Sequence, residues 1–117
     1  MKKSIAMEWA DLLESGMFKQ GKHKLEHKEE YCCLGILCNM AERKGICKVE
    51  REEDHYVSFD DERYNLPDSV RRYAGMKSIY GSFKGKDGDI LLIDLNDTDN
   101  YSFKQIAQVI RDKYKEL

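Results

Sequence analysis

The octapeptide at residues 31–38, Tyr-Cys-Cys-Leu-Gly-Ile-Leu-Cys, constrains the fold most, because it is the most apolar stretch of a strongly hydrophilic chain. Charged residues make up 36% of the 117 residues, and the mean hydropathy is −0.71. In such a chain, a stretch that holds three of the four cysteines is either the centre of the core or a thiol site. Its apolar positions recur at helical spacing: Leu34, Leu37, Cys38 and Ala41. Because apolar side chains surround most of this helix, the pattern predicts a buried, central helix over residues 32–44.

Two glycines bear on this helix. Gly35 lowers its stability by about 1 kcal/mol relative to alanine. Its presence there indicates the close approach of another backbone or of a ligand. Gly45 is expected to end the helix in the left-handed conformation.

Three further helices are predicted over about residues 4–15, 67–75 and 103–115, the first and last from apolar positions at helical spacing and the second from its start and end residues. Trp9 lies on the apolar face of the first of these, which makes it a core residue. Each helix also carries signals at its ends. Those signals are Ser4 as N-cap and Gly16 as end, Pro67 as first helical residue and Gly75 as end, and a capping box of Ser102 with Gln105.

The segment over residues 48–63 alternates acidic and basic residues and is expected to be a solvated loop. Residues 56–59 within it fit a short strand. Its aromatic side chains either anchor the loop to the core or contact a partner. These are Tyr56, Phe59 and the adjoining Tyr64.

Residues 78–83 and 89–95 are expected to pair as a β-hairpin, because both are rich in strand-forming residues and the connection is turn-like. The stretch 90–95 also fits a short helix, since it is too brief for periodicity to decide. We therefore expect one α+β domain over residues 1–117, with about four helices and a short β-hairpin or small antiparallel sheet.

Composition narrows the possible partners and locations. The chain has 20 basic and 22 acidic residues, so its net charge of −2 gives no strong signal for nucleic acid or for an anionic membrane. No apolar run approaches the roughly 20 residues of a membrane-spanning helix. Glu8 and Asp11 interrupt the apolar region that a signal peptide would need. A cytoplasmic location with reduced cysteines is therefore expected, and the sequence gives no indication of the oligomeric state.

The four cysteines allow two functional alternatives to core packing. Zinc ligands usually come in spaced pairs, whereas Cys32 and Cys33 are adjacent and Cys38 lies about 140° from Cys33 around a helix. A zinc-stabilised interaction module would also need His23, His27 or Cys47. A cysteine-dependent hydrolase or transferase would use Cys32 or Cys33 with a histidine, but apolar surroundings raise a thiol pKa. Core packing is favoured, and no catalytic residue, metal ligand or cofactor is assigned.

Two polar segments are candidates for ligand binding. The basic run 19–24 is expected to be a solvated loop, unless its lysines hold phosphate beside a glycine that permits close backbone approach. The run 95–100 is expected to be a turn leading into the last helix, unless its polar side chains form a recognition surface. For a nucleotide-like ligand, the residues expected to bind are Gln20, Gly21 and Lys22 near the Gly35 backbone, together with Asn96 and Asp97.

Several segments, taken together, resemble a family of small proteins found in tailed-phage and prophage genomes, most of them uncharacterised. The resemblance covers most of the chain in order but is poor over residues 46–64 and 76–89. The matching pieces are Trp9 with 12–21, Tyr31–Asn39, Leu66-Pro67 with Val70 and Gly75, Leu95-Asn96-Asp97, and Ser102-Phe103 with Ile106-Ala107. The resemblance implies a phage origin, an intracellular setting and a shared fold, and it supplies no catalytic residues.

These observations lead to one functional hypothesis. The chain is expected to be a non-enzymatic, phage-type intracellular binding protein. It would bind a host protein or sequester a small nucleotide-like ligand, with counter-defence as a role that such proteins often serve. The cysteine-dependent enzyme and the zinc-stabilised module are the alternatives.

Overall fold

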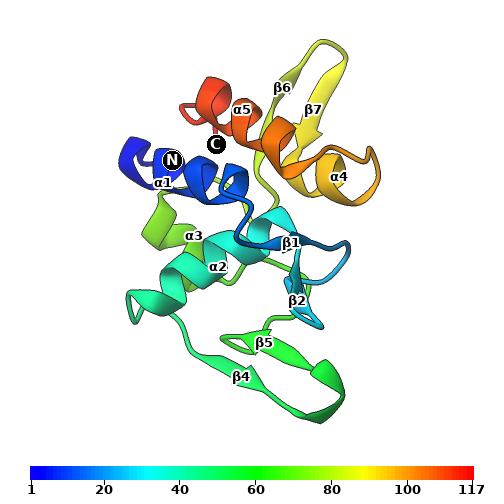
Figure 1. Cartoon of the computed structure of the whole chain (residues 1–117). Coiled ribbons are helices and arrows are strands. Elements are labelled where there is room, and N and C mark those ends of the chain that lie inside the picture. Colours follow the sequence, from blue (N-terminus) through cyan, green and yellow to red (C-terminus); the bar gives the residue numbers. More distant parts are fainter.

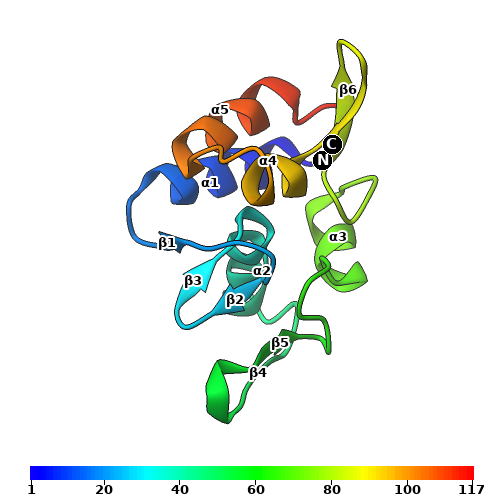
Figure 2. The ribbon, with the colours of Figure 1, turned by 90° about the vertical axis from the view of Figure 1, so that its right-hand side faces the viewer.

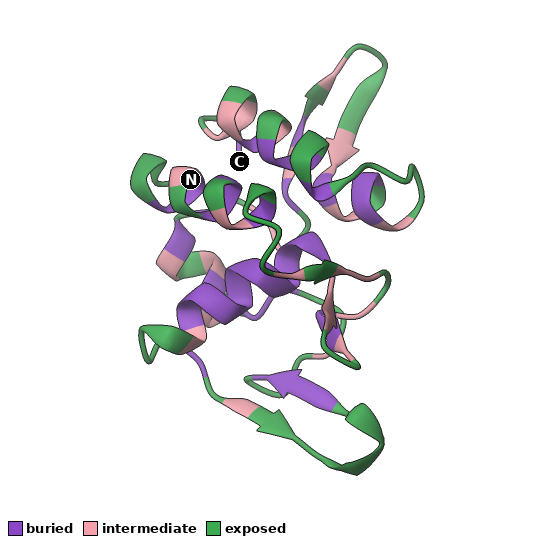
Figure 3. Ribbon diagram, viewed as in Figure 1, coloured by how far each residue is buried: buried purple, intermediate pink, exposed green.

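Helix α2 (Cys33–Arg43) lies at the centre of the computed structural model, which describes all residues from 1 to 117 (Figure 1). Every residue from Cys33 to Ala41 is buried, as Figure 3 shows along this helix. Gly45 follows the helix with a φ of +72°, the left-handed conformation expected at its end. The prediction of a buried, central helix over residues 32–44 is therefore confirmed.

Helices α1 (Lys3–Glu14) and α5 (Phe103–Lys113) lie side by side above α2 in Figure 1, and Figure 2 shows the same arrangement from the side. Arg111 of α5 forms ion pairs with Asp11 and Glu14 of α1. Trp9 is fully buried, and its indole Nε1 donates a hydrogen bond to the carbonyl of Cys33 at 2.9 Å. Trp9 is thus a core residue, as predicted, and it joins α1 to the first turn of α2.

The shorter helices are α3 (Asp68–Ala74) and α4 (Leu92–Asp97). Gly75 ends α3 at a φ of +71°, as predicted, but Pro67 is its N-cap, with an extended ψ of 146°, and not its first helical residue. Ser4 is not an N-cap either. It lies inside α1, whose N-cap is Lys2, two residues earlier, where the backbone N–H of Lys2 donates to the carbonyl of Ala74 at 2.9 Å.

The capping box of the last helix was predicted from local sequence, and it forms. The hydroxyl of Ser102 accepts a bond from the backbone of Gln105 at 3.1 Å, and the Gln105 side chain accepts one from the Ser102 backbone at 2.9 Å. Both partners lie within one turn, so no tertiary contact is needed to form this cap.

Three small sheets complete the fold, and each lies beside the helical core rather than within it (Figure 1). The first has the strand order β1-β3-β2, with β1 parallel to β3 and β2 antiparallel to it. The other two are antiparallel pairs. The strands are β1 (Lys19–Gln20), β2 (Glu26–His27), β3 (Glu30–Tyr31), β4 (Val49–Arg51), β5 (Val57–Phe59), β6 (Ser82–Gly85) and β7 (Gly88–Leu91).

The predicted hairpin in the second half of the chain is present, but it is shorter than expected, and only residues 82–83 of its predicted first strand belong to β6. Strands β6 and β7 pair across a two-residue connection, and the chain enters α4 directly after Leu91. Residues 90–95 are therefore strand for two residues and helix for the remainder, so each alternative was partly right. The side chain of Phe83 is buried, which anchors β6 to the body.

The charged segment 48–63 is a hairpin and not the solvated loop predicted from its composition. Strands β4 and β5 pair in the register Val49 to Phe59, and a 3-10 turn, η1 (Glu53–His55), joins them. All three residues of β5 are buried, which the predicted strand at 56–59 had indicated in part. Burial of this strand packs the hairpin against the body.

The predicted α+β class is confirmed. There are five α-helices where about four were expected, because residues 92–97 add α4. Its antiparallel sheets are small, as predicted, although β1 adds one parallel pair. None of the helices has the length and apolarity that crossing a bilayer requires.

Candidate functional site

Five of the six residues predicted to bind a ligand come together around the side chain of Asn96. They belong to two segments far apart in sequence, the end of β1 with the residues that follow it and the last turn of α4. The five are Gln20, Gly21, Lys22, Asn96 and Asp97. The run 95–100 therefore begins in a helix, and only its second half forms the predicted turn.

Asn96 is fully buried, and its amide uses all four of its hydrogen-bonding positions. Its Oδ1 accepts a bond from Gln20 Nε2 at 2.9 Å and one from the backbone N–H of Cys33 at 3.2 Å. Its Nδ2 donates to the carbonyl of Gly21 at 2.9 Å and to Asp97 Oδ1 at 2.7 Å. No group of this side chain is left for a ligand.

The bond to Cys33 has a structural consequence for α2. The N-cap residue of that helix, Cys32, supplies no side-chain hydrogen bond. The first backbone N–H groups of a helix lack partners within the helix and need an acceptor from elsewhere. Asn96 provides it from 63 positions further along the chain.

Gln20 makes three side-chain hydrogen bonds within the protein. Besides its bond to Asn96, its Nε2 donates to the carbonyl of Tyr101 at 2.8 Å. Its Oε1 accepts a bond from the backbone N–H of Phe103 at 3.2 Å, at the start of α5. The two side chains thus bind β1, α4, α5 and α2 to one another, so we assign them a structural role.

The outer edge of this network is exposed and carries the remaining charges. Lys22 donates from Nζ to Asn100 Oδ1. The backbone N–H of His23 donates to Asp97 Oδ1 at 3.0 Å, and its imidazole Nδ1 lies 3.8 Å from Asp97 Oδ2. These contacts hold the turn after β1 against the turn after α4.

Gly35 lies apart from this network and contacts a backbone, one of the two alternatives predicted for it. A Cβ atom built on Gly35 would lie 1.8 Å from the carbonyl oxygen of Leu25, which no side chain permits. Leu25 itself is fully buried. The glycine therefore lets the backbone just before β2 pack directly on α2.

All four cysteines are free and buried. Burial raises the pKa of the Cys32 thiol to about 12, and it raises the pKa values of Cys33 and Cys38 well above their usual range. Burial likewise raises the pKa of Cys47 to about 11. A cysteine nucleophile must be an accessible thiolate. These thiols are neither, so they are core residues and do not support the cysteine-dependent enzyme.

The zinc alternative also lacks a ligand set. No group of three or more His, Cys, Asp or Glu side chains is arranged to hold a metal ion. His27 lies near another histidine, His55, with ring centroids 6.2 Å apart, but no third ligand joins them. The chain therefore offers no arrangement for a structural zinc ion.

The strongest candidate for a binding surface lies on the connection from α1 to β1 and was not predicted from the sequence. An open hollow of about 510 Å³ is present there. Met17, on its rim, is 67% exposed, more than any other large hydrophobic residue of the chain. The residues that line the hollow are Met17, Phe18, Lys19, Lys28, Glu29 and Tyr31.

Aromatic rings form the floor of this surface, which we call the Met17 hollow. Phe18 and Tyr31 pack edge to face with ring centroids 5.2 Å apart. The guanidinium of Arg43 lies 5.8 Å from the centroid of the Phe18 ring. Met, aromatic residues and Arg are the residue types enriched in the centres of protein interfaces. Gly16 indicated only the end of the first helix, and nothing was predicted for Met17, so no local sequence signal could have identified this surface.

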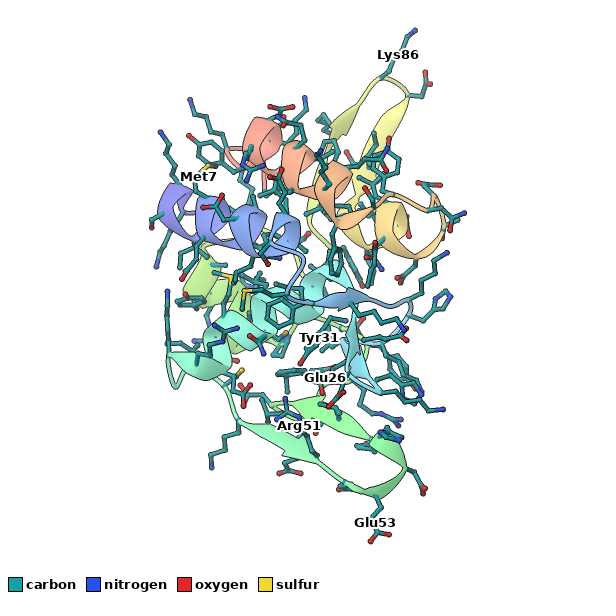
Figure 4. The ribbon with its side chains drawn as sticks, viewed as in Figure 1. Met7, Glu26, Tyr31, Arg51, Glu53 and Lys86 are labelled. Carbon is teal, nitrogen blue, oxygen red and sulfur yellow. The ribbon has the colours of Figure 1, made fainter.

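A buried carboxylate lies beside this hollow. Glu26 of β2 is 5% exposed, and its two oxygens accept bonds from Arg51 of β4 at 3.0 and 3.3 Å. Arg51 also lies 3.7 Å from Glu42 of α2. Burial, with the Glu26 carboxylate close by, raises the pKa of Tyr31. Figure 4 shows Tyr31, Glu26 and Arg51 in succession, so the pair connects the hollow to the β4–β5 hairpin.

A second open hollow, of about 320 Å³, lies near the C-terminus. Phe83 is its one hydrophobic lining residue, and that side chain is buried. The other lining residues are Lys77, Ser78, Ser82, Lys84, Asp89 and Glu116. It therefore presents no exposed large hydrophobic side chain comparable to Met17.

Comparison with known proteins gives one result. Residues 1–114 match the model of a family described as a domain of unknown function, DUF8296. No curated protein and no solved structure matches the chain. Because the match spans nearly the whole sequence, the chain belongs to the DUF8296 family.

Proposed function

We propose that this chain is a non-enzymatic, phage-type binding protein that acts inside the host cell on a host protein, with counter-defence as its role. The observation that carries the proposal is the exposed Met17 beside the Phe18–Tyr31 pair in an open hollow. Covering a large, flexible, apolar side chain that is otherwise exposed to water lowers the free energy of the complex and so favours binding. The phage origin rests on the sequence resemblance alone.

A protein partner is favoured over a nucleotide-like ligand for two reasons. The hollows are open, whereas small-molecule sites usually enclose most of the ligand's surface. The amides of Gln20 and Asn96, which were expected to contact a nucleotide, form hydrogen bonds within the protein instead. A protein that covers Met17 and the rings of Phe18 and Tyr31 needs neither an enclosed pocket nor the amides of Gln20 and Asn96.

The test is capture of a binding partner by three immobilised forms of the chain from bacterial extract. These are the wild type, Met17→Glu, and a matched control, Tyr80→Glu, which changes an exposed aromatic residue outside the hollow. We expect one protein to be retained by the wild type and the control but not by Met17→Glu. With the purified partner, Met17→Glu should weaken binding by about tenfold or more, the effect of losing an interface anchor.

Two outcomes would contradict the proposal. One is retention that Met17→Glu leaves unchanged, because the partner would then bind elsewhere. The other is failure to retain any protein, whether or not a panel of nucleotides raises the melting temperature. A rise with nucleotides would identify the chain as a ligand-sequestering protein instead. Circular dichroism of each variant confirms that the fold is retained.

A further inference from the structure

We infer that the outer edge of β4 binds a lysine- or arginine-rich extended segment of a partner protein, which adds to the β4–β5 hairpin as a third strand. This inference takes from the proposed function only the existence of a protein partner. It adds a second contact surface and the chemistry of the segment that the surface accepts.

The free edge follows from the hydrogen-bond pattern of the hairpin. The carbonyl of Lys48 accepts a bond from Asp60 at 2.8 Å, and the N–H of Glu52 donates to Tyr56 at 2.8 Å. In an antiparallel pair, hydrogen-bonded and non-hydrogen-bonded positions alternate. The backbone groups of Val49 and Arg51, which lie between these positions, therefore point away from β5.

Nothing in the chain covers this edge. The sheet has only two strands, and Figure 1 shows no other segment along the outer side of β4. The chain has one proline, and it lies outside the hairpin, so no proline blocks the edge. Glu50 and Arg51 are exposed, and Val49 is half-buried. An exposed strand edge of this kind is where a peptide can add by main-chain hydrogen bonds.

The hairpin is also held rigidly enough to act as a template. Val57 and Phe59 of β5 are buried in the core. On the opposite strand, the Glu26–Arg51 bonds fix β4 to the body. A preformed strand costs less ordering free energy when it binds than a mobile loop would.

Charge selects the occupant. Residues 48–63 contain three basic and seven acidic residues, a net charge of −4. The whole chain carries −2, so the remainder of the protein carries +2. Of the acidic residues in this segment, none forms an ion pair within the protein. The tip, where Figure 4 shows Glu53 projecting, has no basic residue from 52 to 62 except His55.

The charge of Arg51 does not offset this field, because Glu26 and Glu42 already engage it. A second copy of the chain is disfavoured at this edge, since it would place two segments of −4 side by side. A basic segment is favoured instead. Lysine or arginine side chains on the added strand would neutralise the hairpin's carboxylates while its backbone pairs with Val49 and Arg51.

The test uses the full chain and synthetic heptapeptides of alternating lysine and valine, which model a basic strand. A matched peptide replaces lysine with glutamate, and a third keeps the lysines but carries N-methyl groups on alternate amides, so that one edge cannot pair. We expect only the unmodified basic peptide to slow hydrogen exchange at the amides of Val49 and Arg51, by tenfold or more. We also expect the N-methylated peptide to bind at least fivefold more weakly.

A variant tests the same contact from the protein side. Val49→Pro removes an outward N–H that makes no bond within the protein, so the hairpin can keep its own ladder. It should weaken binding of the basic peptide at least fivefold, whereas Met17→Glu should leave that binding unchanged. Equal affinity for the basic and N-methylated peptides, or unprotected amides at Val49 and Arg51, would overturn the inference. Partner capture that still depends on Met17 would then show that the proposed function survives without it.

Discussion

Replacing Asn96 by alanine is the most direct test of how this fold is held together. The substitution removes four hydrogen bonds, to Gln20, Cys33, Gly21 and Asp97, from a fully buried position. Each such bond contributes a net stability of about 0.5–1.5 kcal/mol. We therefore expect Asn96→Ala to lower the free energy of unfolding by about 4 kcal/mol.

This loss converts to a measurable change in melting temperature. The entropy of unfolding near the midpoint is about 2.1 cal/mol/K per residue, so for 117 residues a loss of about 4 kcal/mol lowers the melting temperature by roughly 15 °C. Trp9 is the one tryptophan of the chain and is fully buried, so its fluorescence reports urea unfolding without an added probe. Circular dichroism then shows whether helix content falls with it.

Asn65→Ala is the matched control, because Asn65 is exposed and its change should alter stability by less than about 0.5 kcal/mol. A double-mutant cycle with Gln20→Ala should give a coupling energy of about 1–2 kcal/mol, since the two amides bond directly. The reasoning would be refuted if Asn96→Ala cost less than about 1 kcal/mol relative to Asn65→Ala. The hydrogen bonds of the buried Asn96 amide would then be hardly more favourable than those that the same amide makes to water in the unfolded chain.

Three further predictions concern other contacts. Gly35→Ala should lower the urea midpoint of unfolding although alanine has the better helix propensity. The added Cβ would collide with the carbonyl of Leu25, and overpacking of this kind costs about 1–3 kcal/mol or more. An unchanged midpoint would show that the segment around Leu25 can move away without cost. Glu26→Gln should destabilise the chain by about 1–2 kcal/mol and speed hydrogen exchange in β5, because Arg51 loses the nearer of its two charged partners. Unchanged exchange would mean that burial of β5 alone holds the hairpin. Below pH 9 the cysteine thiols are protonated in both the folded and the unfolded chain. Above pH 9 the thiols of the unfolded chain ionise first, because burial raises the pKa values of the folded ones. The free energy of unfolding should therefore fall by up to about 1.4 kcal/mol per pH unit for each buried thiol, and for Cys32 this fall should continue to about pH 12. Urea unfolding at pH 8 and 10 should show this slope, with a smaller slope for Cys32→Ala, and equal slopes would argue against it.

Much of the fold was predictable because its signals are local. The apolar spacing of α2, the glycine that follows it and the capping box of α5 all involve partners within one or two turns. The start of α1 was not predictable in this way. Ser4 was the expected cap, yet the backbone of Lys2 bonds to Ala74, and that distant contact decides where the helix begins.

The candidate site was likewise predictable in part. The sequence identified Gln20, Gly21, Lys22, Asn96 and Asp97 as polar residues of interest, and the chain does bring them together. It could not show that the amides of Gln20 and Asn96 form a hydrogen bond with each other, because this bond depends on contact between two segments about 75 residues apart in sequence. The Met17 hollow could not be predicted either, since a lone methionine after a turn carries no signal of its exposure.

The apolar pattern of the sequence favoured residues 32–38 as the centre of the core, and these residues are buried. Apolar side chains on every side of a helix in a highly charged chain have no other favourable place, because water is excluded only there. The tertiary structure decided what that helix needs to exist. Its packing requires Gly35 against Leu25, and its first turn requires an amide from Asn96, because a buried N–H without a partner costs free energy that no local residue offsets.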